Sequence, residues 1–210
     1  MHAIKRCLTA LTVTLLLGAT APAPAHAYNG SGAAAYADKW AKARNPNYPN
    51  FSADCTNFVS QAMHEGGKYP FRYGGDPWYA WWQTYAIGGG WAYTQYWSVS
   101  WQLRNFLAYD APGGIPAGTA AGTATNYYTP SSMVTGDVLF YDWGTGEGIS
   151  HANMQVGIGN DPNYPNGQTW YGNYVDQHIT DRYHAFWSLR PYNANYKTTK
   201  IYFMHISSAN

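Results

Sequence analysis

Cysteine and charged residues are both scarce in this 210-residue chain. It has two cysteines, and Asp, Glu, Lys and Arg together make up only 11 % of its residues. The formal net charge of +1 gives no excess of basic residues for binding a polyanion, so we expect no nucleic-acid partner. Glutamate occurs only at Glu65 and Glu147. No apolar run approaches the roughly 20 residues that span a bilayer, so we expect no stable membrane insertion.

The first 27 residues have the pattern of a secretory signal rather than of folded structure. Lys5 and Arg6 precede a short apolar stretch, residues 8–17, and a small-x-small pattern ends at Ala27. Cleavage after Ala27 would remove Cys7 and leave residues 28–210 with a net charge of about −1. The sequence therefore predicts a secreted, extracellular protein of one domain, either released or retained at the cell wall.

Helical patterns come first in the mature chain and strand patterns follow. One helix is predicted over residues 31–44, which Asn45-Pro46 stops, and a second over residues 54–66, which Gly66-Gly67 ends. A third helix is predicted over 98–109, followed by a loop over 111–125. Strands are predicted over residues 137–143, 151–158, 170–180 and 198–206. This order predicts an α+β fold with N-terminal helices packed on a C-terminal antiparallel sheet.

Cys55 is the only thiol of the mature chain and has no disulfide partner. Secreted proteins usually pair their cysteines, so an unpaired one is a candidate for chemistry. Cys55 falls where the second helix begins. There the helix dipole favours a thiolate by about 0.3–1 kcal/mol, and the Cys55 N–H is free to donate to an oxyanion. We interpret Cys55 as a nucleophile; the alternative is an inert buried cysteine.

A thiol nucleophile needs a histidine as its base and a third group to hold that histidine. His151 opens a strand after a glycine-rich turn and lies on the polar side of the strand's alternation. His178 lies in a strand that we expect to pair with it, and could bond the far nitrogen of His151. Asp176, on the same face as His178, is the alternative third residue. The histidines at 64, 184 and 205 are interpreted as structural or surface residues.

Several blocks of the sequence resemble the "Putative amidase domain" family of secreted bacterial proteins. The resemblance covers nearly the whole mature chain, and its most specific part is Asp-Cys-Thr-Asn-Phe-Val-Ser-Gln at residues 54–61. It implies a papain-like fold related to CHAP-type cell-wall amidases, with Cys55 as nucleophile, His151 as base and a polar third residue, which we assign to His178. The other blocks are Tyr36-Ala37, Asn45-Pro46, Gly66-Gly67, Gly136-Asp137-Val138, Ser150-His151-Ala152, Gln177-His178 and Asp181-Arg182.

Three other functions make different demands on the sequence. A glycosidase needs two carboxylates facing one cleft, but Asp137 and Asp142 are an odd number of residues apart and point to opposite sheet faces. The segment beginning His64-Glu65 lacks the second histidine of a His-Glu-x-x-His zinc helix. A non-catalytic glycan-binding module is the stronger alternative. The aromatic segment 78–101 could stack on sugar rings, although we expect most of its rings to be core and one or two to line a cleft.

The sequence thus predicts a secreted cysteine amidase or peptidase that works through a thioester. The predicted catalytic residues are Cys55, His151 and His178. No cofactor and no metal is expected. The expected partner is a cell-wall peptide or another amide substrate, and peptidoglycan peptides are the most natural choice outside the cell. The oligomeric state stays open.

Overall fold

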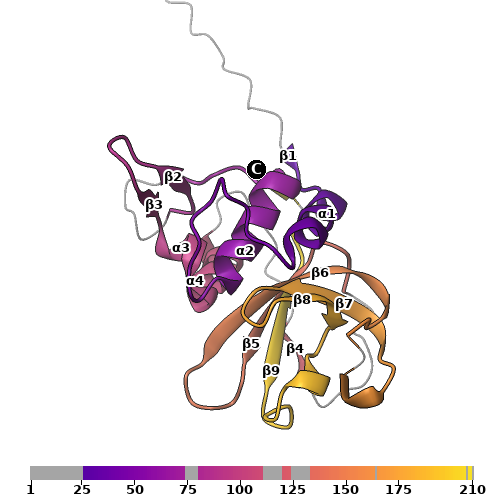
Figure 1. Cartoon of the computed structure of the whole chain (residues 1–210). Helices are drawn as coiled ribbons and strands as arrows, with labels where there is room; N and C mark the ends of the chain where they lie inside the picture. The colour runs from indigo at the N-terminus through magenta and orange to yellow at the C-terminus, as the bar shows by residue number, and fades with distance from the viewer. Residues whose placement is uncertain are drawn as a thin grey trace, which may run out of the picture.

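The structure is a computed structural model that describes residues 26–73, 80–110, 120–123, 133–163, 165–206 and 208–209. The predicted signal, residues 1–27, lies almost wholly outside these residues. Within them, no helix is both long enough and apolar enough to span a membrane. The helices lie together on one side of a sheet, and a short hairpin projects beyond them (Figure 1).

The N-terminal half of the described chain supplies the helices. α1 (Gly30–Trp40) begins at Asn29, whose side chain accepts from the N–H of Gly32 at 2.9 Å and so caps the helix. α2 (Cys55–Gln61) runs directly into the π-helical turn η1 (Ala62–Gly66). The remaining helical segments are α3 (Gln95–Ser98), α4 (Ser100–Asn105) and η3 (Phe106–Asp110), with short 3-10 turns at η4 (Pro165–Gly167) and η5 (Arg190–Tyr192).

Two glycines allow α1 and η1 to touch backbone to backbone. A Cβ on Gly66 would lie 2.2 Å from the carbonyl oxygen of Gly32, and a Cβ on Gly32 would lie 2.3 Å from that of Gly66. No side chain fits at such distances, so both positions require glycine. The contact between Gly32 and Gly66 therefore fixes how the helix that carries Cys55 packs on α1.

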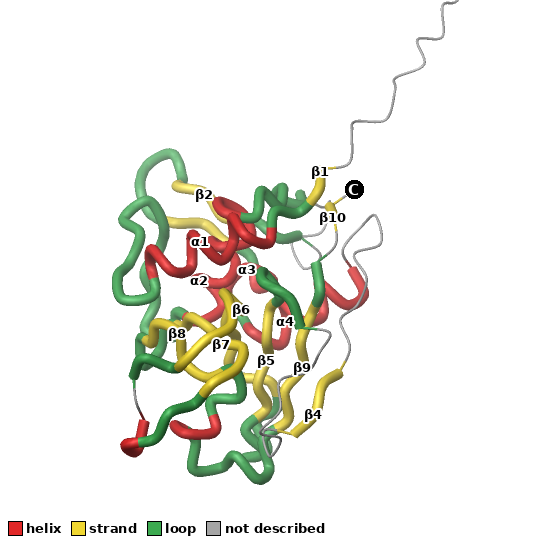
Figure 2. Tube along the Cα trace, turned by 90° about the vertical axis from the view of Figure 1, so that its right-hand side faces the viewer, coloured by secondary structure: helices red, strands yellow, loops and turns green. Residues whose placement is uncertain are grey.

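The C-terminal half forms a six-stranded antiparallel sheet in the order β4-β9-β5-β6-β7-β8 (Figure 2). Its strands are β4 (Ala120–Thr123), β5 (Val138–Asp142), β6 (Ile149–Asn160), β7 (Tyr171–Gln177), β8 (Arg182–Phe186) and β9 (Lys200–Met204). Two small pairs are separate from it: β2 (Gln83–Tyr85) with β3 (Trp91–Tyr93), and β1 (His26–Ala27) with β10 (Ser208–Ala209).

Both faces of the sheet are buried. Phe140 and Met154 pack with Phe58 and Met63 of the helices in one core cluster. On the other face, Leu139 joins a second cluster built around Trp187. Because successive side chains of a strand alternate between faces, every strand next to β5 can direct one residue to the helices and the next to the second cluster.

The predicted α+β class, with helices first and an antiparallel sheet after them, is confirmed. The predicted helix 31–44 ends early, at Trp40, where a side chain from the sheet takes the Trp40 carbonyl. The predicted strand 170–180 ends at Gln177, because Ile179 and Thr180 adopt left-handed conformations at φ 64° and 52°. Strands β2, β3, β4 and β8 were not predicted, and β4 lies in the expected loop 111–125, the rest of which is outside the described residues.

Candidate active site

The polar residues after Cys55 hold α2 in place. The amide of Asn57 donates to the Pro49 carbonyl at 2.7 Å and accepts from the indole N–H of Trp97 at 2.7 Å. The Ser60 hydroxyl donates to the Trp97 carbonyl at 2.8 Å, and Gln61 accepts from the Tyr36 hydroxyl at 2.8 Å. All of these helix side chains are buried, so each needs its partner. These bonds hold α2 to Pro49, Trp97 and Tyr36.

Cys55, the first residue of α2, meets His151 of β6. Burial alone would raise the pKa of the thiol, since only 4 % of Cys55 is exposed. The hydrogen bond and charge of His151 outweigh burial, helped by the Ser100 hydroxyl and the Ala152 backbone, and lower the thiol pKa to about 6. The thiolate is therefore the main form at neutral pH, which is the form that attacks.

Gln177, the last residue of β7, holds the other side of His151. Its Oε1 lies 3.1 Å from His151 Nε2. Its Nε2 donates to the carbonyls of Ile179 and Thr180 at 3.3 and 3.0 Å, and those two acceptors decide which end of the amide faces the imidazole. His151 Nε2 must then carry its proton, so Nδ1 is left to exchange a proton with Cys55.

His178 does not hold His151, which corrects our assignment of the third residue. Its Nδ1 lies 2.5 Å from Asp54 Oδ2, and its Nε2 lies 2.9 Å from the Trp40 carbonyl, so both ring nitrogens are occupied. The reason is the alternation of β7: the Gln177 side chain shares a face with Val175 in the second core cluster, whereas the His178 ring packs against Phe58 of α2.

Asp176, the alternative third residue, also lies away from His151. Its Oδ1 accepts from the backbone N–H of His184 at 2.6 Å. Burial raises the pKa of Asp176 above its ordinary value; the hydrogen bond from His184 opposes this, and a hydrogen bond and the charge of the Asp38 carboxyl reinforce it. The structure thus gives Asp176 and His178 other partners and brings Cys55, His151 and Gln177 together.

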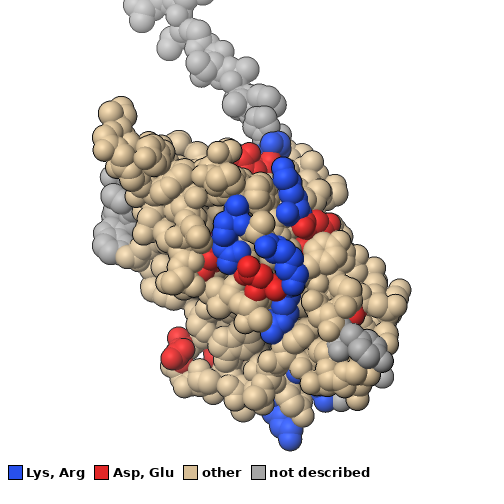
Figure 3. Space-filling model, in the orientation of Figure 1, with Lys and Arg blue, Asp and Glu red and all other residues tan. Residues whose placement is uncertain are grey.

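A network of charged groups anchors the start of α2 to the sheet. Asp54, which is fully buried, pairs with His178 and with Arg44 Nε at 3.1 Å. Arg44 also forms a two-pronged pair with Asp181, with both N···O distances 2.9 Å. On the face shown in Figure 3, Lys and Arg side chains gather in a band between the helices and the sheet, with acidic side chains among them. This network includes His178, which was predicted to hold His151, and Asp181, which stands in one of the blocks of the family resemblance.

Pockets lie on both sides of the Cys55–His151 pair. One, of about 310 Å³, is lined by Cys55 and includes the carboxylate Glu147 and the exposed ring of Trp101. The other, of about 330 Å³, is lined by His151, Gln177, Trp143 and Arg182. Ser150 lines both, and the Trp143 ring stacks on His151 at 5.6 Å between centroids. The two pockets therefore meet at Ser150, one on the side of Cys55 and the other on the side of His151.

The aromatic segment divides between the core and the pocket. Trp81 and Trp97 are fully buried, whereas Trp101 is 48 % exposed and lines the pocket beside Cys55. Trp78 and Tyr79 lie outside the described residues. Of the eight rings that the structure describes in this segment, only Trp81, Tyr96 and Trp97 are buried, so the prediction that most of the rings are core is wrong. The prediction that one or two line a cleft agrees with Trp101.

The other histidines make ordinary pairs in two cases. His64 bonds the Tyr69 carbonyl and stacks on Phe71, and His205 pairs with Asp137 at 2.9 Å. His184 joins two carboxylates, those of Asp38 and Asp176.

Gln177, Ser100 and Trp143 were not predicted as site residues from the sequence. Gln177 stands within the Gln177-His178 block of the family pattern, and that position was its only sign in the sequence.

The comparison with protein families decides what kind of domain carries this site. The model of the family described as "Putative amidase domain" matches residues 27–204. The chain belongs to this family. The family description indicates hydrolysis of amides, so an amidase-type hydrolase is the activity that membership supports.

Two relatives from Bacillus subtilis (strain 168) resemble this amidase-family chain. YhbB is 29 % identical over 181 residues, which are 85 % of this chain and 50 % of YhbB. YjcM is 32 % identical over 126 residues, 60 % of this chain and 25 % of YjcM. Both are described as uncharacterized, and the chain spans half or less of their length. No solved structure matches the chain.

Proposed function

We propose that this protein hydrolyses amide bonds with Cys55 as nucleophile, His151 as acid and base, and Gln177 as the residue that positions His151. The observation that carries the proposal is the thiol of low pKa, about 6, at the start of a helix and bonded to an imidazole that a buried amide holds. Membership of an amidase family supports the same reaction.

The reaction would proceed in two steps. The Cys55 thiolate attacks the carbonyl carbon, the C–N bond breaks, and the His151 imidazolium gives its proton to the leaving amine. A water then attacks the thioester while His151 takes its proton, the C–S bond breaks, and Cys55 leaves as the thiolate while the acid is released. The Cys55 N–H, at the first turn of α2, is placed to donate to the oxyanion in both steps.

A papain-like relationship is part of the proposal. It rests on the arrangement of the groups: the cysteine opens a helix of the N-terminal half, and the histidine and its amide partner lie on neighbouring strands of the C-terminal sheet. Sequence resemblance to the papain-like cell-wall amidases points the same way.

The proposed substrate is a peptide of the cell wall. The pocket beside Cys55 offers the carboxylate of Glu147, and the pocket beside His151 offers the guanidinium of Arg182. A peptide that carries an amine on one side of the cut and a carboxylate on the other would complement both, as peptidoglycan peptides can. The signal-like residues 1–27 support secretion, which would bring the protein to such a substrate.

The test is incubation of residues 28–210 with purified peptidoglycan, followed by mass spectrometry of the soluble fragments. Fragments that carry a new amine and a new carboxylate are expected from the wild type and not from Cys55→Ala. If both proteins release none, the wall substrate is wrong. If both sediment with the wall and neither cleaves it or a library of amides, the protein is a non-catalytic glycan-binding module.

A further inference from the structure

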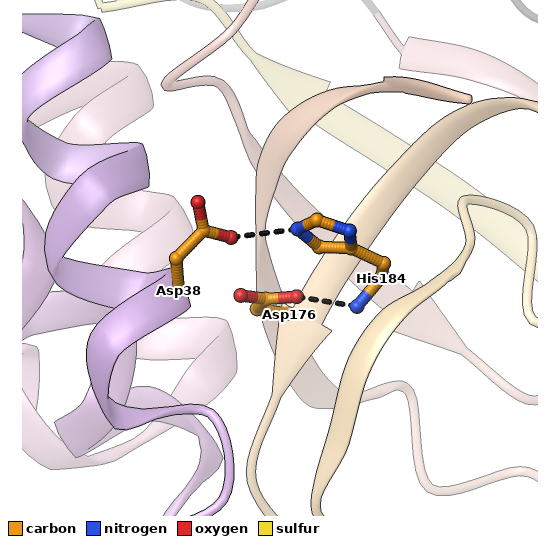
Figure 4. Close-up of side chains that lie close together, drawn as sticks. All are labelled: Asp38, Asp176 and His184. Carbon is orange, nitrogen blue, oxygen red and sulfur yellow. Dashed lines mark hydrogen bonds and ion pairs between the residues drawn. The ribbon is translucent and has the colours of Figure 1, made fainter. Parts of the chain in front are cut away.

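Three side chains that the proposed reaction does not use converge between α1 and the sheet (Figure 4). Asp38 comes from α1, Asp176 from β7 and His184 from β8. One ligand atom from each lies within 4.8 Å of the other two. Among the described residues this is the one group of three His, Cys, Asp or Glu side chains that close together.

A bulge in the sheet brings His184 to this position. The register between β7 and β8 shifts between Val175 and Gln177, so β8 has an extra residue opposite Asp176. His184 adopts a left-handed conformation at φ 55°, and its N–H donates to Asp176 Oδ1 instead of to the strand ladder. Its imidazole stacks on Tyr174 and Tyr183, which fixes the direction of Nε2.

Asp176 supplies a buried oxygen that faces the Asp38 carboxyl (Figure 4). The residue is 0 % exposed, and its Oδ2 has no hydrogen-bond partner among the residues that the structure describes. Figure 4 shows this second oxygen on the side of the Asp38 carboxylate, away from the His184 N–H. A buried carboxylate oxygen that faces another carboxylate needs a cation or a proton between them.

Within the cluster, His184 Nε2 bonds Asp38 Oδ1 at 2.8 Å, but no Lys or Arg side chain among the described residues forms an ion pair with Asp38 or Asp176. The charge of Lys42 reaches Asp176, but its ammonium donates to the Asp181 carbonyl at 2.8 Å. Asp38 is 39 % and His184 17 % exposed, so solvent reaches the cluster from the side opposite Asp176. The arrangement is one buried ligand beneath two accessible ones.

We propose that Asp38, Asp176 and His184 bind a divalent metal ion, for which Zn²⁺ is the best fit. One imidazole nitrogen with two carboxylate oxygens is a ligand set that Zn²⁺ accepts, whereas Ca²⁺ and Mg²⁺ prefer oxygen alone. Three protein ligands leave a fourth position for water. Tetrahedral ligands about 2.0 Å from Zn²⁺ lie about 3.3 Å apart, so the half-exposed Asp38 need move only slightly.

The proposed ion would join α1 to the β7–β8 pair, behind the strand end that carries Gln177. Asp176 and Gln177 are neighbours in β7 and point to opposite faces, so the ion would stabilise the strand without touching the substrate. Its role is therefore structural, and its presence does not depend on the cysteine reaction.

The test uses the Cys55→Ala protein, because a Cys55–His151 pair could itself bind Zn²⁺. After dialysis against EDTA, ZnCl₂ is titrated calorimetrically, and the melting temperature is followed with and without it. We expect binding of one ion per chain and a melting temperature raised by several degrees, which EDTA reverses. Asp38→Asn and His184→Asn should each weaken Zn²⁺ binding by more than about 100-fold, since loss of a ligand exceeds loss of an outer partner.

His205→Asn is the matched control, since His205 pairs with a single carboxylate, Asp137, and should leave Zn²⁺ affinity unchanged. Circular dichroism reports whether each variant is folded, and Asp38→Asn, on an accessible helix position, keeps the test open if His184→Asn does not fold. Absence of saturable Zn²⁺ binding would overturn the proposal and leave a carboxyl pair that shares a proton. Binding that survives both Asp38→Asn and His184→Asn would overturn it as well.

Discussion

The reactivity of Cys55 depends on which of two opposing effects on its thiol is larger. Burial disfavours the thiolate, but the hydrogen bond and charge of His151 prevail and lower the pKa to about 6. At pH 7 such a thiol is about 90 % ionised, compared with about 3 % for an ordinary cysteine. We expect the rate of alkylation by iodoacetamide, and kcat/KM on any amide substrate, to rise with pH through about 6.

Two variants test, separately, that His151 lowers the pKa of the Cys55 thiol and that this thiol is the group that reacts. His151→Ala removes the favourable contacts and leaves burial, so the alkylation midpoint should move above pH 8. Cys55→Ala should abolish hydrolysis and alkylation while the melting temperature stays close to that of the wild type. An alkylation midpoint near pH 8.5 in the wild type would mean that the thiol is an ordinary one.

Gln177 should affect catalysis through the orientation of His151. Its amide bonds three groups, and Gln177→Ala frees the imidazole to rotate away from the thiol. We expect kcat to fall by about 10–100-fold with KM little changed, by analogy with loss of an outer-shell partner that orients a histidine. Steady-state kinetics measures both.

His178, the neighbour of Gln177, is the control, because the sequence predicted His178 as the residue that holds His151. His178→Asn should lower the melting temperature, since it removes bonds to Asp54 and Trp40, but the alkylation midpoint of Cys55 should stay near pH 6. If instead Gln177→Ala has full activity and folded His178→Asn has none, the assignment of the third residue returns to His178.

At the scale of elements, the beginning of α2 depends on a buried ion pair rather than on its own capping. Asp54 makes no side-chain cap, and its carboxylate serves His178 and Arg44 instead. Asp54→Ala leaves the buried His178 without its charged partner. We expect it to lower the free energy of unfolding by about 3–5 kcal/mol, measured by urea denaturation.

Asp181→Ala tests whether the loss in the free energy of unfolding depends on how deeply the carboxylate is buried rather than on its charge alone. Asp181 also pairs with Arg44, but its side chain is 33 % exposed. Its loss should cost no more than about 1 kcal/mol. Equal losses in the two variants would show that the network acts through overall charge, contrary to the structure.

At the scale of the whole molecule, one aromatic segment serves both the core and the cleft. Trp81 is fully buried and Trp101 lines the pocket beside Cys55. Trp81→Ala should cost about 3–5 kcal/mol of stability. Trp101→Ala should change stability by less than about 0.5 kcal/mol and raise KM with little effect on kcat, because it removes binding away from the reacting bond.

Melting curves and kinetics on both variants decide between these roles. A large loss of stability in Trp101→Ala, with unchanged KM, would place this ring in the fold and remove it from substrate binding. Because α2 and α4 line one pocket and the end of β7 the other, the site exists only where the helical half meets the sheet.

Much of the local structure follows from the order of residues. The block from Asp54 to Gln61 identifies a helix, and an unpaired cysteine at its start is enough to suggest a nucleophile. The alternation of Ala152, Met154 and Val156 predicts a strand with His151 on its other face, and the structure has that strand. These patterns are local, so the sequence carries them directly.

The third member of the site could not be read in this way. Gln177 and His178 are adjacent and both polar, and only the face on which each lies tells them apart. That face depends on the register of β7 against β6 and on the left-handed turn at Ile179 and Thr180. The sequence by itself determined the α+β class and placed Cys55 and His151; the tertiary structure decided that Gln177 meets the imidazole and that Asp38, Asp176 and His184 converge. Such contacts join residues far apart in the chain, and their geometry is set by strand register and packing, which no local pattern encodes.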